Sequence, residues 1–152
     1  MTQWQCKKFD ELTKEELYQI LKVRQNVFIL EQNCAYEDID GLDDAAWHLI
    51  GSDIDALGSL SINAYLRILG PGVKYTEISF GRVLISMHAR GFGLGQELVA
   101  KAISIINEEF PNQSIKISAQ QHLLRFYSAF GFESVSDPYD EDGIPHIEML
   151  KA

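Results

Sequence analysis

The sequence has few cysteines, few basic residues and no long apolar run. Its 152 residues include only two cysteines, Cys6 and Cys34, and no Cys/His cluster with the spacing of a zinc site. No stretch is long and apolar enough to span a bilayer. The first residues, MTQWQCKKFDEL, lack the apolar core and cleavage site of a signal peptide. These absences predict a metal-free protein of the reduced cytoplasm.

Basic residues are outnumbered, with 13 Lys and Arg against 22 Asp and Glu and a formal net charge of -9. This balance argues against non-specific binding to nucleic acid or to anionic membranes, which needs a basic surface. It is compatible with a cationic substrate, although solubility alone is the commoner reason for acidity. The length and the 46% apolar content fit one domain, residues 1–152, with a single core.

Apolar periodicity predicts a mixture of strands and helices. TKEE at Thr13 has the pattern of a capping box and begins a helix that continues to Phe28, and the acidic stretch from Glu31 to Asp44 reads as an irregular loop. A helix from Leu94 ends near Pro111, and a shorter one ends at Gly131. Strands are expected at 3–9, 47–50, 60–69, 77–86, 114–118, 132–135 and 144–150.

The order of these elements indicates which strands are neighbours. GPG at 70–72 turns the strand 60–69 into an antiparallel partner. The helix between the strands 77–86 and 114–118 is a crossover connection, which makes these two strands parallel neighbours. Three glycines in ARGFGLGQEL, at 89–98, lie between the first of them and the helix.

Glycines before a helix allow an anion to approach the unpaired N–H groups of its first turn. Gln96 and Glu97 follow the last glycine, whereas a nucleotide P-loop needs Lys and then Ser or Thr. The spacing GxGxG also differs from the dinucleotide pattern GxGxxG. A phosphate group of another ligand is the favoured guest, and a tight turn without a ligand is the alternative.

Arg90, Gly93 and Gly95 spell RxxGxG, which resembles the pyrophosphate-binding signature of the GNAT superfamily of acyl-CoA-dependent N-acyltransferases. QHLLRFYSAFGFESV is similar to the second motif of that family, with Tyr127 at its tyrosine. RQNVFILEQNCAYEDIDGLD and EDGIPHIEM resemble the ElaA-like branch. Together these motifs cover most of the chain and occur in the order of the family.

The resemblance implies an α/β single-domain GNAT fold, with a mixed central sheet of about seven strands, helices on both faces and a splayed parallel strand pair. It implies acetyl-CoA as the acyl-donor substrate. The pyrophosphate would lie on the N–H groups from Arg90 to Gln96, and the pantetheine arm between the strands that end at Ile85 and Ser118. The implied donor contacts are Val83, Leu84, Ile85, Arg90, Gly91, Phe92, Gly93, Leu94, Gly95, Gln96, Gln120 and Tyr127.

No Ser/His/Asp or Cys/His arrangement is evident, so we expect direct transfer without an acyl-enzyme, and Cys34 is only a weak nucleophile candidate. In the family the tyrosine that Tyr127 matches reaches the sulfur and is the usual general acid. Its alternative is core packing beside Phe126 and Phe130. Gln120 stands where the family often has an asparagine.

The sequence leaves the base and the acceptor open. His146 and Glu77 are the candidates for the base, and a water chain is the alternative. Arg24 lies on an apolar helix face, where it either pairs with Glu31 or an aspartate of 37–44 or binds an acceptor carboxylate. Glu31 and Gln32 are further candidates for acceptor contacts.

The expected acceptor is a small-molecule amine or a protein amine, and the expected assembly is a monomer or a homodimer. Two other functions remain open at this point. One is a non-catalytic acyl-CoA-binding or sensor protein. The other is an acyl-CoA-dependent synthase that acts on an aminoacyl compound, because RQNVF also resembles acyl-homoserine lactone synthases.

Overall fold

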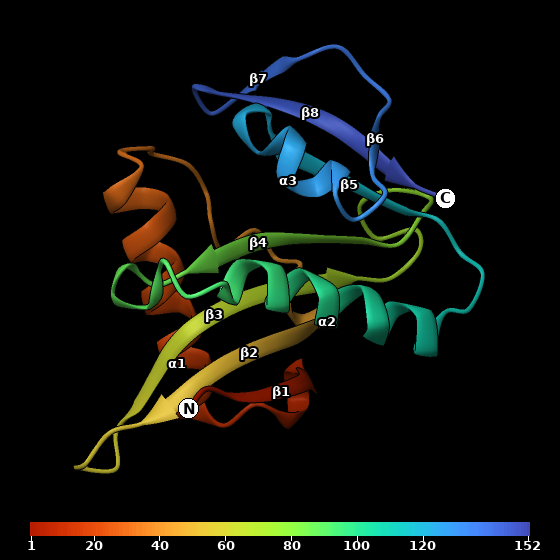
Figure 1. The fold of residues 1–152 in the computed structure, drawn as a ribbon. Helices are drawn as coiled ribbons and strands as arrows, with labels where there is room; N and C mark the ends of the chain where they lie inside the picture. Colours follow the sequence, from red (N-terminus) through yellow and green to blue (C-terminus); the bar gives the residue numbers. More distant parts are fainter.

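Eight strands form two antiparallel sheets in a computed structural model that describes all of residues 1–152. The first sheet has the order β1-β2-β3-β4, and in the second β5, β6 and β7 all pair with β8 (Figure 1). The strands are β1 (Gln3–Lys8), β2 (Ala46–Ile54), β3 (Leu60–Leu69), β4 (Ser79–Ile85), β5 (Ile115–Gln120), β6 (Glu133–Ser134), β7 (Tyr139–Glu141) and β8 (Ile144–Lys151).

The two sheets meet along β4 and β5, which run parallel, as the crossover helix predicted. The only pairing between them is the bridge of Ile78 with Ile115, where the Lys116 N–H donates to the Ile78 carbonyl at 2.8 Å. Beyond this bridge the strands diverge (Figure 1). The expected mixed sheet and its splayed pair are therefore present, but as two antiparallel sheets joined at one point. We call the opening between β4 and β5 the seam.

Helices cover both faces of the first sheet, as expected. α2 (Leu94–Glu109) buries Leu98, Val99, Ala102 and Ile106 on one face, and α3 (Leu124–Ser128) lies beside it. α1 (Lys14–Arg24) covers the other face, where Ile20 packs against Ile62 and Tyr65. Residues 62–69 of β3 are consequently buried on both faces, whereas the alternation in the sequence predicted a half-buried strand. No helix has the length and apolarity that crossing a membrane requires.

α1 begins at the predicted capping box, in which the Glu16 N–H donates to Thr13 Oγ1 at 3.0 Å. Its last part differs from the expectation, because Gln25–Glu31 forms a π-helix. The bonds that follow it are i to i−5: the N–H of Gln32 donates to Val27, and that of Cys34 to Ile29. Such wide turns occur often at functional sites. We call Gln25–Glu31 the π-segment.

A buried network of arginines and aspartates lies on the α1 face. Arg24 has 0% exposure and donates through Nε to Asp38 Oδ2 at 3.0 Å and through NH1 to Asp43 Oδ1 at 2.6 Å. Arg67 contacts Asp43 and Asp40 in turn. The acidic stretch, predicted as a solvated loop, therefore folds inward over its arginines. Of the two alternatives for Arg24, these contacts show the ion pair with aspartates of 37–44. The side chain has no exposed surface that could bind an acceptor carboxylate.

His48 is also part of this network. It has 0% exposure and lies between the Tyr65 hydroxyl, at 2.7 Å, and the Asp43 carbonyl, at 2.9 Å. Burial lowers the pKa of His48, so the ring stays neutral in the folded protein. These contacts give His48 a structural role.

Removing the Arg24 guanidinium should destabilise the fold strongly, because Asp38 and Asp43 are buried and each would lose one of its two arginine partners. We expect Arg24→Ala to lower the free energy of unfolding by about 3–5 kcal/mol in urea denaturation. Lys7→Ala is the control, since Lys7 pairs with Glu16 in a partly exposed setting and should cost less than about 1 kcal/mol. Equal losses in the two variants would contradict a structural role for the network.

Candidate active site

The glycine turn combines left-handed backbone with open space. Gly91 has φ +88° and Gly93, the N-cap of α2, has φ +77°. A Cβ built on either residue would meet no protein atom within 4 Å. Gly95 lies inside α2, where a Cβ would be 3.8 Å from Phe126. The first two glycines are thus required by the backbone conformation, and the space in front of them is not filled by the protein.

The N–H groups of this turn are unused. Those from Gly91 to Gln96 donate to no acceptor in the protein, and the first helical bond runs from the Glu97 N–H to the Gly93 carbonyl at 3.3 Å. Consecutive free N–H groups at the positive end of a sixteen-residue helix attract an anion. Together with the open space at the glycines, they fit a pyrophosphate.

Arg90, at the start of the turn, is held by the protein itself. Its Nε donates to the Ile85 carbonyl at 2.9 Å, and its two terminal nitrogens donate to the Glu31 carboxylate, NH2 at 2.7 Å. This contact raises the pKa of Arg90 and lowers that of Glu31. Arg90 therefore ties the π-segment to the turn. The resemblance implies that the backbone of Ile85 contacts the acyl donor. In this structure the Ile85 carbonyl accepts a hydrogen bond from Arg90 Nε.

β4 is interrupted just before the turn. Gly81 pairs with Arg67 and Leu84 pairs with Tyr65, so Arg82 and Val83 together face the single residue Leu66. This is a β-bulge, and Arg82 within it has φ +52°. On its other edge β4 borders the seam, where no ladder forms beyond the Ile78 bridge. Val83 and Ile85 are half-buried there, whereas the Leu84 side chain is part of the core under α1.

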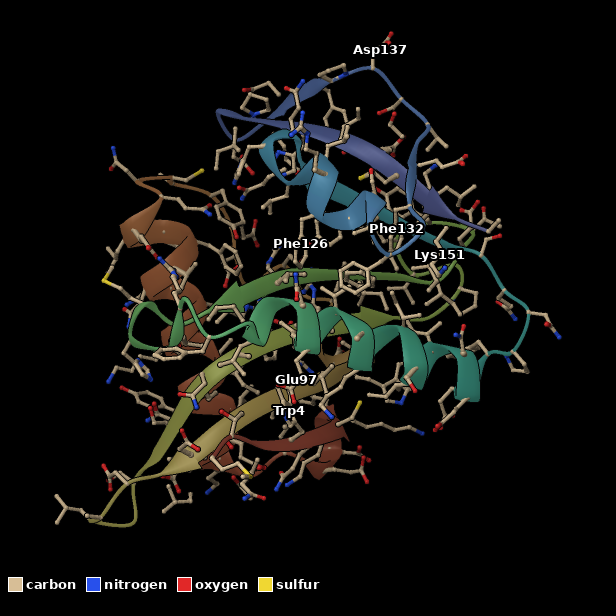
Figure 2. All side chains as sticks on the ribbon, in the orientation of Figure 1. Trp4, Glu97, Phe126, Phe132, Asp137 and Lys151 are labelled. Atoms are coloured by element: carbon tan, nitrogen blue, oxygen red, sulfur yellow. The ribbon has the colours of Figure 1, made fainter.

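A groove of about 770 Å³ runs from the turn between α2 and α3. Figure 2 shows Phe126 between these two helices and Glu97 on the outer side of α2. Arg125 supplies a cationic group to the groove. The lining residues are Gly93, Gln96, Glu97, Ala100, Arg125, Phe126, Ala129 and Phe130. The groove begins at the turn, because Gly93 and Gln96 line it.

Tyr127 has the core packing that the sequence offered as one alternative, while its hydroxyl is left without a partner in the protein. It is 4% exposed, and its ring packs among those of Phe80, Phe126 and Phe132. Its hydroxyl makes no hydrogen bond within the protein. The oxygen is not fully buried, so it still contacts solvent. Burial raises the pKa of Tyr127, which keeps the hydroxyl protonated. A core residue thus presents a free proton donor.

His146 lies on the opposite face of the second sheet. Its neighbour Ile147 packs in the core with Tyr127, so alternation along β8 places His146 on the other face. Its Nε2 is 3.1 Å from Glu141 Oε2, and its Nδ1 is 2.7 Å from the Ile144 carbonyl. The Tyr139 ring stacks on the imidazole, and its hydroxyl bonds to Ser118 on β5. These polar groups line the face opposite α3.

The remaining candidates separate into two groups. Gln32 and Gln120 come together, with 3.5 Å between Oε1 and Nε2 at the end of β5. Glu77 instead precedes β4 beside the Ile78 bridge, at the opposite end of the strand from Ile85 and the turn. That placement argues against Glu77 as the base. Cys34 is buried and donates to the Asp142 carbonyl at 2.9 Å, so its contacts are structural.

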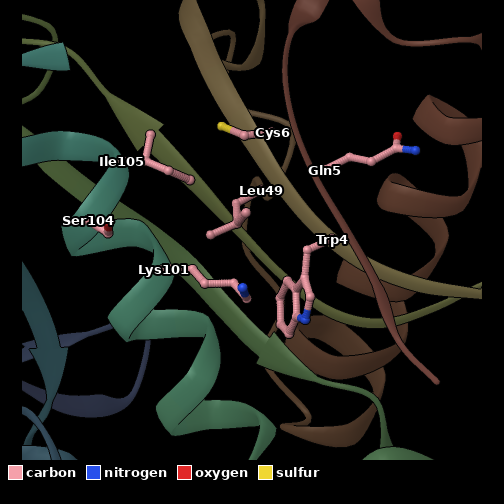
Figure 3. A pocket seen from close by; sticks show the side chains of 7 residues that line it. All are labelled: Trp4, Gln5, Cys6, Leu49, Lys101, Ser104 and Ile105. Atoms are coloured by element: carbon pink, nitrogen blue, oxygen red, sulfur yellow. The ribbon is translucent and has the colours of Figure 1, made fainter. Parts of the chain in front are cut away.

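A second pocket, of about 250 Å³, lies between β1 and α2 (Figure 3). Trp4 from β1 and Lys101 from α2 meet in it, with the ammonium 5.4 Å from the ring centre. Cys6 also lines this pocket. Burial raises the pKa of the Cys6 thiol to about 11, so this cysteine is protonated and a poor nucleophile. The glycine turn contributes no residue to this pocket.

Comparisons with known proteins agree with this geometry. The family model for an acetyltransferase (GNAT) domain matches residues 59–152. A UPF0039 protein of Synechocystis is 45% identical over 147 residues, covering 97% of this chain and 93% of its own. Escherichia coli ElaA is 40% identical over 153 residues, covering 99% and 97%. In structure, ElaA has a TM-score of 0.91, and an acyl-CoA N-acyltransferase from Pseudomonas aeruginosa has 0.92 at 38% identity, with both chains fully covered.

Proposed function

The chain belongs to the GNAT acetyltransferase family, and from this premise we propose that it transfers an acetyl group from acetyl-CoA directly to a primary amine. The observation that carries the proposal is the run of free N–H groups from Gly91 to Gln96 beside an open seam. The run of N–H groups fits the pyrophosphate of the acyl donor, and the seam fits its extended pantetheine arm. The acceptor is a small-molecule or protein amine, and we place the reaction in the cytoplasm.

The donor would bind along β4. The backbone N–H groups of the turn would hold the pyrophosphate, and the N–H groups of Arg90 that do not bond to Glu31 or Ile85 would add a charged contact. The amides of the pantetheine arm would pair with the free edge of β4 at Val83, as an added strand pairs with a sheet edge. Gln120, at the end of β5, would border the arm from the other side. This arrangement places the thioester in the seam.

The reaction forms a C–N bond and breaks a C–S bond, so one proton must leave the amine and one must reach the sulfur. The Tyr127 hydroxyl would donate to the departing thiolate from the α3 face. His146 would accept the amine proton, directly or through water, from the opposite face. The seam lies between these two faces, so the acid and the base would act on different sides of the thioester.

The partners of His146 hold its ring in place. The Ile144 carbonyl lies 2.7 Å from Nδ1 and can only accept a hydrogen bond, which favours the tautomer with the proton on Nδ1. Nε2 would then be the atom that accepts the amine proton. Glu141, 3.1 Å from Nε2, would orient the ring and stabilise the cation that catalysis generates.

A binding protein without activity is the main rival. An acceptor screen with acetyl-CoA, monitored by release of free thiol, separates the two. Transfer to an amine supports the enzyme. Tight binding of acetyl-CoA with no thiol released from a broad panel of amines favours a sensor.

Gly93→Val should abolish donor binding, because its side chain would occupy the open space in front of the turn. Gly58→Val is the matched control, since Gly58 also has positive φ, +82°, and a Cβ on it would likewise meet no protein atom within 4 Å. We expect similar losses of thermal stability in both variants. Calorimetry should show acetyl-CoA binding only in the control. Unchanged affinity in a folded Gly93→Val protein would leave the glycines with a structural role.

Tyr127→Phe should lower kcat by about 10²-fold while KM for acetyl-CoA changes little. The hydroxyl acts mainly in the transition state, and a thiolate is a good leaving group, which places the effect at the low end for general acids. The ring and its packing remain, so the fold should hold. Because burial raises the pKa of Tyr127, the hydroxyl stays protonated across the assay range, so the loss of kcat should be the same at every pH. A normal kcat with much weaker acetyl-CoA binding would instead make Tyr127 a donor-positioning residue.

His146→Gln should lower kcat by about 10²–10⁴-fold with little change in KM for acetyl-CoA, because an amide cannot accept the amine proton. Glu77→Gln is the control and should behave as wild type, because Glu77 lies at the far end of β4. An unchanged kcat in His146→Gln would assign the base to a water chain. A loss of activity in the control would contradict the placement of the site.

A further inference from the structure

Arg82 has a backbone conformation that its residue type does not favour. Four residues other than glycine have positive φ, and three of them, Asn33, Asn112 and Asp142, belong to types that adopt this conformation readily. Arg82, with φ +52°, is the exception, and it lies inside a strand rather than in a turn. Such strain persists only where the surrounding structure imposes it, and it concentrates at functional sites.

The side chain of Arg82 shows what imposes it. Its Nε is 2.8 Å from Asp38 Oδ1, and its NH2 donates to the Asp38 carbonyl at 3.1 Å and lies 3.3 Å from Asp40 Oδ2. The guanidinium also lies over the Tyr36 ring, 5.3 Å from its centre. Residues 36–43, which we call the acidic segment, are themselves fixed by Arg24 and Arg67. The side chain of Arg82 is thus held by the acidic segment, which lies outside the sheet; we call these contacts the clamp.

The clamp acts on the part of β4 that borders the seam. At the bulge, Arg82 and Val83 face only Leu66, so the ladder between β3 and β4 is broken there. A bulge leaves backbone groups unpaired and bends its strand. If Arg82 returned to an extended conformation, β4 could pair regularly with β3, and the groups at Val83 would be drawn into that ladder.

We propose that Arg82 is a positioning residue for the acyl donor: the acidic segment holds its backbone in the left-handed conformation, and this keeps the bulge at Val83 open to the amide-bearing arm of the thioester. The proposal rests on the proposed function, and it adds a role for residues 36–43, which do not line the groove. Arg82 would act through the backbone and would not contact the reacting atoms.

The test compares Arg82→Ala with Arg82→Gly. Both variants remove the guanidinium, but glycine adopts positive φ without strain and alanine does not. Two probes separate the arm from the phosphates: acetyl-CoA, and 3′-phosphoadenosine 5′-diphosphate, which lacks the pantetheine arm. Affinities are measured by calorimetry and folding by thermal denaturation. Asn112→Ala is the control for strain alone, because Asn112 has φ +62° in the connection between α2 and β5, away from the seam.

We expect Arg82→Ala to weaken acetyl-CoA binding by about tenfold, the effect of losing one or two backbone hydrogen bonds. Arg82→Ala should bind the diphosphate as wild type does. The affinity of Arg82→Gly for acetyl-CoA should lie between those of wild type and Arg82→Ala. Asn112→Ala should bind both probes normally. Unchanged acetyl-CoA affinity in folded Arg82→Ala, or equal losses for both probes, would overturn the proposal. Failure of the wild-type protein to bind acetyl-CoA would overturn the proposed function instead.

Discussion

The structure depends on a seam that the backbone does not close. Two antiparallel sheets share one parallel bridge, between Ile78 and Ile115, and beyond it the edges of β4 and β5 are left without a ladder. Open strand edges inside a domain are costly unless another group pairs with them. What holds the sheets together instead is the apolar core under α2 and α3, in which Phe132 packs edge to face with Phe80 and with Tyr127. This core also brings the glycine turn to the open end of the seam.

The opposite face is organised by charge. Three arginines and three aspartates meet under α1, with side-chain exposures from 0% at Arg24 to 25% at Asp40. Burying such groups costs much of what their attraction returns, so the network is weak evidence for stability as such. Its consequence is geometric: the acidic segment is fixed on α1 and β3 and in turn fixes Arg82. A separate ion pair, between Arg90 and Glu31, connects the π-segment to the turn. The seam is therefore bordered by elements that charge holds in place.

Local patterns in the sequence predicted much of this arrangement. The capping box at Thr13, the crossover helix and the glycine turn each depend on residues close in the chain, and the structure shows them where the sequence placed them. Arg24 on an apolar stripe signalled a buried partner among residues 37–44. The proposed roles of Tyr127, His146 and the turn residues rest on this placement and remain predictions.

Other features depend on contacts between distant segments, and no local pattern carried them. The π-segment replaces ordinary helical bonds where Glu31 reaches Arg90. The bulge at Arg82 requires the acidic segment, and β3 is buried on both faces because two helices cover it. Glu77 precedes β4, as the sequence indicated, but the sequence did not reveal that the seam is closed at Ile78 and open at Ile85.

A crystal structure of the protein with CoA would test the central claim most directly. The account predicts the pyrophosphate against the N–H groups of Gly91 to Gln96, and the pantetheine arm in the seam, paired with β4 at Val83 and with its sulfur directed toward the Tyr127 hydroxyl. A structure with CoA in the pocket between Trp4 and Lys101, or with β4 and β5 paired along their whole length while the ligand lies elsewhere, would contradict it.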